Sequence, residues 1–337
     1  MILVDDERFS DHLRGLSHPE RPDRVAAIAA HLAAEGLDRE RVPARDATDD
    51  EILLVHPSAY LERVKRDVGS IPPGGATYLS TGDTVIDASS LAVARRAAGG
   101  AIVAMERAVA GDTAAFAVVR PPGHHAEPAR GMGFCIFGNA AIAARAFHVR
   151  TGGRALVVDF DYHHGNGTQR SAGDGVSFVS THAYPQYPGT GSADEQRFES
   201  DAIVNVPLPP DTFATEAFIR VWAEALPAIA ARVKPDLLVV SAGYDYAAGD
   251  PVGDLGIDGP GAAAALARII RGVAQTYARG RVAYVLEGGY DPATLAKSVA
   301  ATMRAHDGDE AIALGEPDAA AVPPGQRRVL RRVAEWA

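Results

Sequence analysis

Carboxylate and imidazole side chains gather directly after an apolar run at residues 155–158 (ALVV). That run has the composition of a buried parallel strand, and it is followed by Asp159, Asp161 and the pair His163–His164. Alternate residues of an extended chain point the same way, so Asp161 and His163 can reach one metal ion together. Carboxylate oxygen and imidazole nitrogen suit a divalent cation such as zinc. Asp159 lies deeper and is placed to orient a neighbouring group.

Three further polar segments follow apolar, strand-like runs in the same way. They are RPPGHH at Arg120–His125, SAGYD at Ser241–Asp245 and EGGY at Glu287–Tyr290. The carboxyl ends of parallel strands form one edge of an open α/β sheet, and ligands bind at that edge. A single histidine pair or aspartate in a loop is an ordinary surface feature. Four polar clusters past four strand ends indicate a functional site.

These segments belong to an ordered set of motifs through which the sequence resembles the histone deacetylase superfamily. That superfamily includes the acetylpolyamine amidohydrolases and the bacterial histone-deacetylase-like amidohydrolases. The matching segments run in the family's order and are HPERPDR (18–24), VHPSAYL (55–61), RPPGHHA (120–126), GMGFCIFGNAAIAA (131–144), VVDFDYHHGNGTQ (157–169), YPGTG (187–191), SAGYDYAAGDPVG (241–253) and LEGGYD (286–291). The GNG and SAGYD variants are more similar to the class II and bacterial branches than to class I.

The resemblance implies a zinc-dependent amidohydrolase that removes acetyl groups from amines. Asp161, His163 and Asp245 are implied to hold one catalytic zinc, and taken alone Asp245 would be a helix N-cap or a turn residue. Tyr290 follows two glycines and is implied to stabilise the oxyanion that forms on the carbonyl oxygen. The alternative for Tyr290 is a buried core side chain.

Amide hydrolysis also needs a group that takes a proton from water and gives one to the leaving amine. The resemblance implies that His125 is this general base and acid and that His124 is its electrostatic partner. Asp159 is expected to accept from His124, and Asn166 is expected to contact His125. Class I enzymes usually carry Asp at the position of Asn166. Because Asn lacks the charge, His125 should be held less strongly as imidazolium.

The same resemblance implies a narrow apolar tunnel for an acyl-lysine-like substrate. Phe134 and Tyr187 match its two aromatic wall positions, and Gly133 keeps the wall thin. Tyr187 replaces the more usual Phe, so its hydroxyl is expected to narrow or polarise the entrance. Val252 occupies the rim position, where polyamine-selective eukaryotic relatives carry an acidic residue.

Three further assignments rest on the resemblance. Either Asp83 or Thr84 falls in the 80–90 loop, where relatives hold the substrate amide. Arg21 matches an arginine near an internal exit channel for acetate, and a surface salt bridge is the alternative. A structural potassium ion is expected beside the zinc loop, at Asp159, Asp161, His163, Ser180 and Thr181.

The coarse pattern alternates apolar strands with amphipathic helices, which favours a parallel sheet covered on both faces. The strand-like runs are 115–119, 155–158, 176–180, 237–240 and 282–286. The helical segments are 24–35, 89–110, 139–150, 215–232, 260–278 and 292–305. The resemblance implies the arginase/deacetylase fold, an α/β class three-layer α/β/α sandwich with a mostly parallel central sheet. We expect a single zinc-dependent deacetylase domain over residues 1–337, with a short amphipathic helix at about 326–337 packed on it.

Composition narrows the range of possible binding partners and of cellular locations. The formal net charge of -10 argues against direct nucleic-acid binding and is compatible with a cationic acetylated substrate. The first residues lack a signal peptide pattern, and no apolar run is long enough for a membrane helix. The single cysteine excludes an intrachain disulfide and fits a reducing compartment, so we expect a cytoplasmic protein. Oligomeric state and the choice between protein lysine, acetylpolyamine and another acylated amine remain open.

Two other function classes share this fold. An arginase-type ureohydrolase binds two metals through D-x-H-x-D and D-x-D-x-x-D-P motifs. Gly165 and Ala247 stand where that family has the carboxylates for the second metal, so this reading is disfavoured. A non-catalytic acyl-lysine-binding or acetoin-pathway relative is also disfavoured, because every catalytic position is intact.

Overall fold

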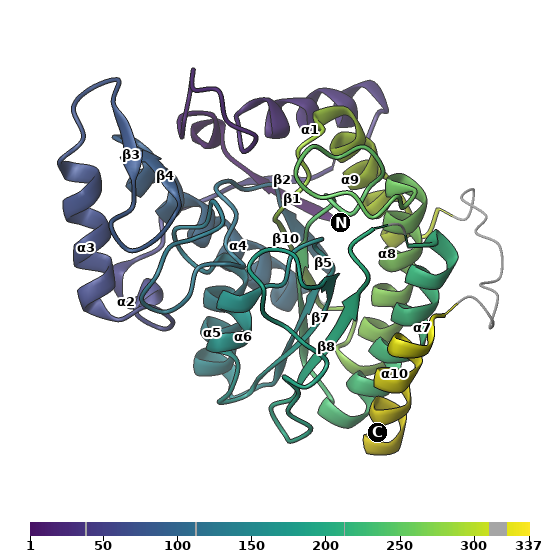
Figure 1. Cartoon of the computed structure of the whole chain (residues 1–337). Coiled ribbons are helices and arrows are strands. Elements are labelled where there is room, and N and C mark those ends of the chain that lie inside the picture. Colours follow the sequence, from purple (N-terminus) through teal and green to yellow (C-terminus); the bar gives the residue numbers. More distant parts are fainter. Residues whose placement is uncertain (38, 112, 212, 310–321) are drawn as a thin grey trace.

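Apolar runs form one eight-stranded sheet in the computed structural model, which describes residues 1–37, 39–111, 113–211, 213–309 and 322–337 (Figure 1). The strand order is β2-β1-β5-β10-β9-β6-β7-β8, and every neighbouring pair is parallel. The strands are β1 (Ile2–Asp5), β2 (Arg41–Pro43), β5 (Ala114–Ala117), β6 (Ala155–Asp159), β7 (Val176–Ala183), β8 (Ile203–Leu208), β9 (Leu237–Ala242) and β10 (Val282–Leu286). A separate antiparallel pair joins β3 (Ala76–Tyr78) to β4 (Val85–Asp87).

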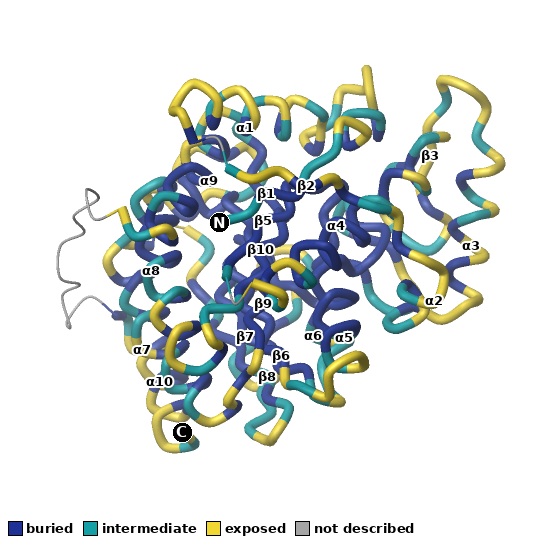
Figure 2. The backbone as a smooth tube through the Cα atoms, turned by 180° about the vertical axis from the view of Figure 1, so that it is seen from behind, coloured by how far each residue is buried: buried dark blue, intermediate teal, exposed yellow. Residues whose placement is uncertain are grey.

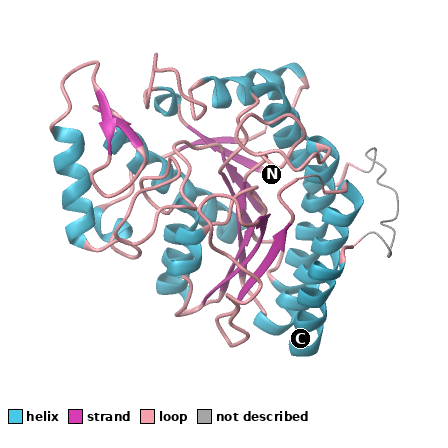
Figure 3. Ribbon diagram, viewed as in Figure 1, coloured by secondary structure: helices cyan, strands magenta, loops and turns pink. Residues whose placement is uncertain are grey.

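The central strands β5, β10, β9 and β6 are mainly apolar and are buried along their whole length, because both faces of the sheet are covered. Leu156 and Val158 of β6 belong to one hydrophobic core, whereas Val157 between them belongs to a second core on the opposite face. Figure 2 shows the strands as the buried centre of the molecule. The predicted three-layer α/β/α architecture is therefore confirmed (Figure 3).

Helices cover the two faces unequally. The first core takes side chains from α1 (Asp23–Ala34), α7 (Thr215–Val233), α8 (Gly259–Tyr277), α9 (Pro292–Asp307) and α10 (Pro324–Trp336). The second core takes them from α2 (Asp49–Ile52), α3 (Ser58–Gly69), α4 (Ser90–Gly111) and α5 (Asn139–Thr151). The shorter elements are η1 (Glu7–Ser10) and α6 (Asn166–Ser171). The amphipathic helix α10 packs against α7 and β8.

The strand order gathers the four polar segments at one edge. The strands that precede them, β5, β10, β9 and β6, are consecutive neighbours in the sheet. In register, Asp159 at the end of β6 pairs with Ser241 of β9 and with Ser180 of β7. Segments separated by more than a hundred residues in the chain therefore meet beyond the carboxyl ends of four adjacent strands.

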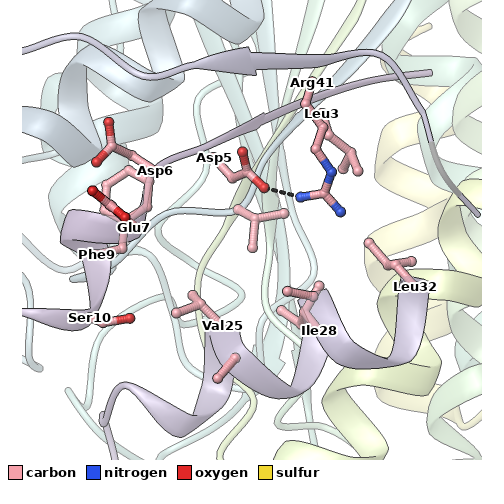
Figure 4. Close-up of a pocket in the computed structure, with 13 residues that line it drawn as sticks. Leu3, Asp5, Asp6, Glu7, Phe9, Ser10, Val25, Ile28, Leu32 and Arg41 are labelled. Atoms are coloured by element: carbon pink, nitrogen blue, oxygen red, sulfur yellow. Dashed lines mark hydrogen bonds and ion pairs between the residues drawn. The ribbon is translucent and has the colours of Figure 1, made fainter. Parts of the chain in front are cut away.

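A surface cavity of about 270 Å³ lies between the N-terminal strand and α1 (Figure 4). Its walls are mostly apolar and include Leu3, Val25 and Ile28, whereas Asp5 at its margin forms an ion pair with Arg41. No residue of the four polar segments lines it. In the described parts of the chain, no helix combines the length and the apolar character needed to cross a membrane.

Candidate active site

A buried group of two carboxylates and one imidazole lies just past the carboxyl ends of β6 and β9. Asp161, His163 and Asp245 each offer a ligand atom, and these atoms lie within 4.8 Å of one another. His163 Nδ1 is 3.2 Å from Asp161 Oδ1 and 2.9 Å from Asp245 Oδ2. Among the described residues, this is the one group of three such side chains with metal-ligand spacing. The structure thus brings together the three predicted ligands, whereas His164 turns to Thr190.

Backbone N–H groups hold the two carboxylates. Asp161 Oδ1 accepts from His163 N at 2.8 Å, and its Oδ2 accepts from Gly288 N at 2.8 Å. A Cβ at Gly288 would lie 2.5 Å from Asp161 Oδ2, so this approach requires glycine. Asp245 Oδ1 accepts from Tyr162 N at 2.9 Å, whereas its buried Oδ2 has no hydrogen bond of regular geometry among the described residues and lies 2.9 Å from His163 Nδ1. A buried carboxylate oxygen that lacks a regular hydrogen bond and faces another candidate ligand fits a metal site.

The protonation properties of this group also fit a cation. Burial, together with the Asp161 carboxylate, raises the pKa of Asp245 to about 7. Burial disfavours a charged His163, but Asp245 and Asp161 outweigh it and raise its pKa to about 9. A bound cation would relieve the repulsion between two buried carboxylates. Two carboxylates and one imidazole form a donor set that suits zinc.

The histidine pair lies beside this group, with its two ring centroids 4.0 Å apart. His124 Nδ1 is 3.1 Å from Asp159 Oδ2, and His125 Nδ1 is 2.8 Å from Asn166 Oδ1, the partners expected from the sequence. Burial opposes a charge on His124, but Asp161 and Asp159 outweigh it and hold its pKa well above the ordinary value. Burial, reinforced by His124, holds the pKa of His125 well below it. The pair therefore combines a charged imidazolium with a neutral imidazole.

Glu287 fixes the turn that carries the histidines, a role that the sequence did not reveal. Its Oε2 accepts from Gly123 N at 2.7 Å and from His124 N at 3.1 Å. The side chain is fully buried, and burial raises the pKa of Glu287 to about 7. The sequence shows Glu287 at the start of EGGY. It does not show that this side chain contacts the loop after β5, because that contact depends on β5 and β10 being neighbours in the sheet.

Tyr290 is 7% exposed, and its ring centroid lies 5.7 Å from that of Phe134. Its backbone N–H donates to Asp250 Oδ2 at 2.6 Å, while Val252 N donates to Asp250 Oδ1 at 3.0 Å. One carboxylate therefore ties the tyrosine loop to the rim residue. Burial raises the pKa of Tyr290 well above its ordinary value, so its hydroxyl stays protonated and can donate.

The arginine beside Tyr290 is Arg24, which corrects the assignment of Arg21. The Cζ atom of Arg24 lies 4.8 Å over the Tyr290 ring, and its Nε donates to the Gly289 carbonyl oxygen at 2.6 Å. The side chain of Arg21 is 46% exposed, and its Nε lies 3.3 Å from Asp23 Oδ2. Arg21 therefore forms the surface salt bridge that the sequence left as the alternative. It precedes α1, whereas Arg24 lies on the inward face of the first turn.

A buried carboxylate anchors Arg24. Glu20 Oε1 lies 3.2 Å from Arg24, and both Glu20 oxygens accept from Arg120, at 2.7 and 2.8 Å. Burial opposes ionisation of Glu20, but Arg120 outweighs it and lowers its pKa to about 2. The N-terminal segment is thus joined to the loop after β10 by a chain of buried charges.

A cavity of about 430 Å³ contacts the site. Its lining includes all four predicted tunnel residues, and the full set is Tyr78, Asp83, His125, Gly133, Phe134, His163, Tyr187, Val252 and Tyr290. Gly133 has φ +56°, and a Cβ there would lie 2.3 Å from His125 Cδ2, so the thin wall requires glycine. Phe134 adopts φ +67°, a strained backbone conformation for an aromatic residue.

Asp83 is the member of the 80–90 loop that faces this cavity. Its Oδ2 accepts from the Tyr187 hydroxyl at 3.0 Å, and its Oδ1 accepts from Gly133 N at 2.9 Å. The Thr84 side chain is buried instead, and its hydroxyl donates to the carbonyl oxygen of Cys135 at 3.0 Å. The extra hydroxyl of Tyr187 therefore bridges the two sides of the entrance.

The residues expected around potassium also lie together. Ser180 pairs in register with Asp159, and its Oγ lies 2.9 Å from His182 Nδ1. The buried Oγ1 of Thr181 has no hydrogen-bond partner among the described residues. For a second metal, the positions of Gly165 and the buried Ala247 supply no side-chain ligand.

The parallel sheet and the polar groups at its carboxyl edge define a member of the arginase/deacetylase fold class. The chain belongs to the histone deacetylase family, whose domain matches residues 18–306. A probable deacetylase of Methanothermobacter thermautotrophicus is 36% identical and is aligned over 99% of this chain and 98% of its own. The rice protein named histone deacetylase 10, chloroplastic, is 34% identical over 95% of this chain and 76% of its own.

A solved structure agrees with these sequence relatives. The crystal structure of the HDA15 HD domain superposes with a TM-score of 0.86 at 30% identity, and it covers 99% of this chain and 93% of that domain. The family and the relatives named as deacetylases support a hydrolase with deacetylase activity.

Proposed function

We propose that this protein is a zinc-dependent amidohydrolase that removes acetyl groups from N-acetylated amines and releases acetate. The substrates are acetyl-lysine side chains or small molecules of the acetylpolyamine type. The main support is the juxtaposition of Asp161, His163 and Asp245 with the histidine pair and Tyr290 beside one cavity. These are the groups that hydrolysis of an unactivated amide requires.

Asp161, His163 and Asp245 would hold the catalytic zinc, and the residues around Ser180 and Asp159 would hold a structural potassium ion. Zinc supplies polarisation of the carbonyl and lowers the pKa of a water molecule to about 7. Within this group, Asp245 Oδ2 is a buried oxygen that has no hydrogen bond of regular geometry among the described residues. Asp161 and His163 come from the loop after β6, and Asp245 comes from the loop after β9. The pairing of these two strands therefore fixes the distance of Asp245 from the other two ligands.

The proton transfers belong to the histidines. His125 is neutral and can take a proton from the attacking water, after which it can give a proton to the leaving amine. His124 is held as imidazolium by Asp159 and Asp161, and its positive charge stabilises negative charge that develops nearby. Tyr290 would donate its hydroxyl to the carbonyl oxygen as that oxygen becomes anionic.

The direct test is parallel kinetics of the zinc-loaded protein on an acetyl-lysine peptide, acetylputrescine and acetylspermidine. We expect hydrolysis of at least one substrate with release of acetate, and the ratios of kcat/KM identify the preferred class. If none is hydrolysed although zinc is bound, the protein is a non-catalytic relative that binds acylated amines.

Hydroxamates with an apolar linker are expected to inhibit the enzyme. Their two oxygens suit a zinc ion held by Asp161, His163 and Asp245, and their polar end would reach Tyr290 and His125, which line the same cavity. Inhibition constants should be compared with those of the matched carboxamides, which lack the N-hydroxyl group. Equal activity with and without a large excess of hydroxamate would contradict the zinc mechanism.

The variant Val252→Glu is expected to raise kcat/KM for acetylspermidine relative to an acetyl-lysine peptide. Val252 is partly exposed and lines the cavity, so a carboxylate there can meet the distal ammonium of a polyamine. A partly exposed ion pair contributes up to about 1 kcal/mol, so the shift should be only severalfold.

Val252→Gln is the matched control, because it has the size of Glu without the charge. The kinetics should show no shift in preference for this variant. An equal shift in both variants, or none in Val252→Glu, would mean that residue 252 does not face the substrate.

A further inference from the structure

Glu127 lies directly behind the asparagine that contacts the general base. Asn166 Nδ2 donates to Glu127 Oε1 at 2.8 Å, while Asn166 Oδ1 lies 2.8 Å from His125 Nδ1. Arg170 Nε donates to the same Glu127 oxygen at 2.7 Å. The three side chains of His125, Asn166 and Glu127 therefore form a continuous hydrogen-bonded row from the cavity toward the surface.

The two ends of an asparagine amide are chemically opposite. Its oxygen accepts hydrogen bonds and its nitrogen donates them, so the partners decide which end faces which side. A carboxylate accepts only, so the Glu127 side must receive the Asn166 NH₂ group. The reversed amide would place its oxygen against the Glu127 oxygen, which leaves two acceptors facing each other.

This orientation decides where His125 carries its proton. Because Asn166 presents an oxygen, His125 Nδ1 must be the ring nitrogen that bears hydrogen. The lone pair of the neutral ring is then on Nε2. If Nε2 carried the hydrogen instead, it would have no free lone pair and could not take a proton from water.

The backbone holds this row in place independently of the salt bridge with Arg170. Glu127 N donates to Arg130 O at 2.9 Å, and Arg130 N donates back to Glu127 O at 3.2 Å. Thr168 N donates to His124 O at 3.1 Å, which joins the start of α6 to the histidine turn. Asn166 is 3% exposed, so no bulk water competes for its amide.

We propose that Glu127 is a positioning residue that orients the Asn166 amide and thereby fixes His125 in the tautomer whose Nε2 is free. The inference rests on the proposed function for its catalytic meaning, but the tautomer is a property of the protein itself. Glu127 bears a full negative charge two hydrogen bonds from the ring. It supplies at a distance the charge that an aspartate at position 166 would place directly on the histidine.

The decisive variant is Glu127→Lys in the zinc-loaded protein. A lysine ammonium donates only, so it should turn the Asn166 amide around, and His125 should then carry its proton on Nε2. A long-range ¹H–¹⁵N spectrum of ¹⁵N-histidine-labelled protein identifies the protonated nitrogen, with His125→Gln used to assign the signal. We expect kcat to fall about 10- to 100-fold with little change in KM, as is usual for partners behind a functional histidine.

Three further variants separate positioning from a general structural role. Arg170→Gln removes the surface partner of Glu127 but keeps the Glu127–Asn166 contact, so it should retain the wild-type tautomer and rate. Glu127→Ala removes the constraint without reversing it, and it should show both tautomers and a smaller loss of kcat. In the double variant Glu127→Lys/Asn166→Asp, an acceptor faces His125 again, and the wild-type tautomer and much of the rate should return.

The proposal is overturned if His125 keeps its proton on Nδ1 in both Glu127→Lys and Glu127→Ala. It is also overturned if the double variant is no more active than Glu127→Lys alone. A wild-type protein that hydrolyses no acetylated amine would refute the proposed function, and the spectra would still decide the role of Glu127.

Discussion

Replacing Asp245 with alanine is expected to remove the catalytic zinc and with it nearly all amide hydrolysis. Asp245 is the only one of the three ligands that comes from the loop after β9, and its buried Oδ2 has no hydrogen bond of regular geometry among the described residues. Polarisation by the metal is worth several kcal/mol in the transition state. Because each 1.4 kcal/mol is about tenfold in rate, kcat should fall on the order of 1000-fold or more. Elemental analysis and a fluorogenic acetyl-lysine assay on the same preparation measure both effects.

A matched control distinguishes ligand loss from general damage. Asp258 caps α8 by accepting from Gly261 N and lies outside the ligand group. Asp258→Ala should keep its zinc and its rate constant, although loss of the cap costs about 1 kcal/mol of stability. An Asp245→Ala protein that still binds zinc tightly and in full amount would refute this ligand set.

The second large effect is expected for Tyr290→Phe, which should lower kcat far more than it raises KM. The hydroxyl is needed chiefly when negative charge develops on the carbonyl oxygen, so its loss acts in the transition state. Loss of one such donor typically lowers kcat about 100- to 1000-fold. The ring contacts with Phe134 and Arg24 remain, so the loop should keep its position.

Steady-state kinetics at saturating and limiting substrate separate the two parameters. Tyr284→Phe is the control, because it removes another buried tyrosine hydroxyl, one that lies 3.0 Å from His306. That variant should lose stability but little activity. A Tyr290→Phe enzyme within a fewfold of wild type would exclude the hydroxyl from catalysis.

The parts of the fold that were predictable are those whose side chains repeat a simple pattern. The run 282–286 was expected as a strand, and it is β10 over the same residues. Its β-branched and apolar side chains suit a strand that is buried on both faces of the sheet. β8 was missed, since Asn205 and Pro207 interrupt its apolar pattern. It lies at the edge of the sheet, where proline is tolerated. β1 and β2 were also missed, because four and three residues are too few to show a period.

Site residues that belong to a sequence motif could be predicted one by one. Residues whose role depends on a contact with a distant part of the chain could not. The ligands and the histidine pair could be named, because their types and spacing are characteristic. Arg21 and Arg24 occupy one short motif, and their sequence gives no sign of which side chain turns inward. That choice depends on Glu20 and Arg120, which meet only in the folded chain. The supporting roles of Glu287 and Asp250 were invisible for the same reason.

The contacts of Arg24 have a consequence for how the protein is made. Its guanidinium binds carbonyl oxygens of Glu287 and Gly289, which lie 263 and 265 residues further along the chain. A ribosome adds roughly 5–20 residues per second, so about ten seconds or more separate the synthesis of the two ends of this contact. Glu20 and Arg120, the other members of this network, are synthesised well before Glu287, so the contacts of Glu20 with Arg24 and Arg120 can form earlier. The tyrosine loop gains its support only when nearly the whole chain has emerged, so nascent fragments should hold no completed site.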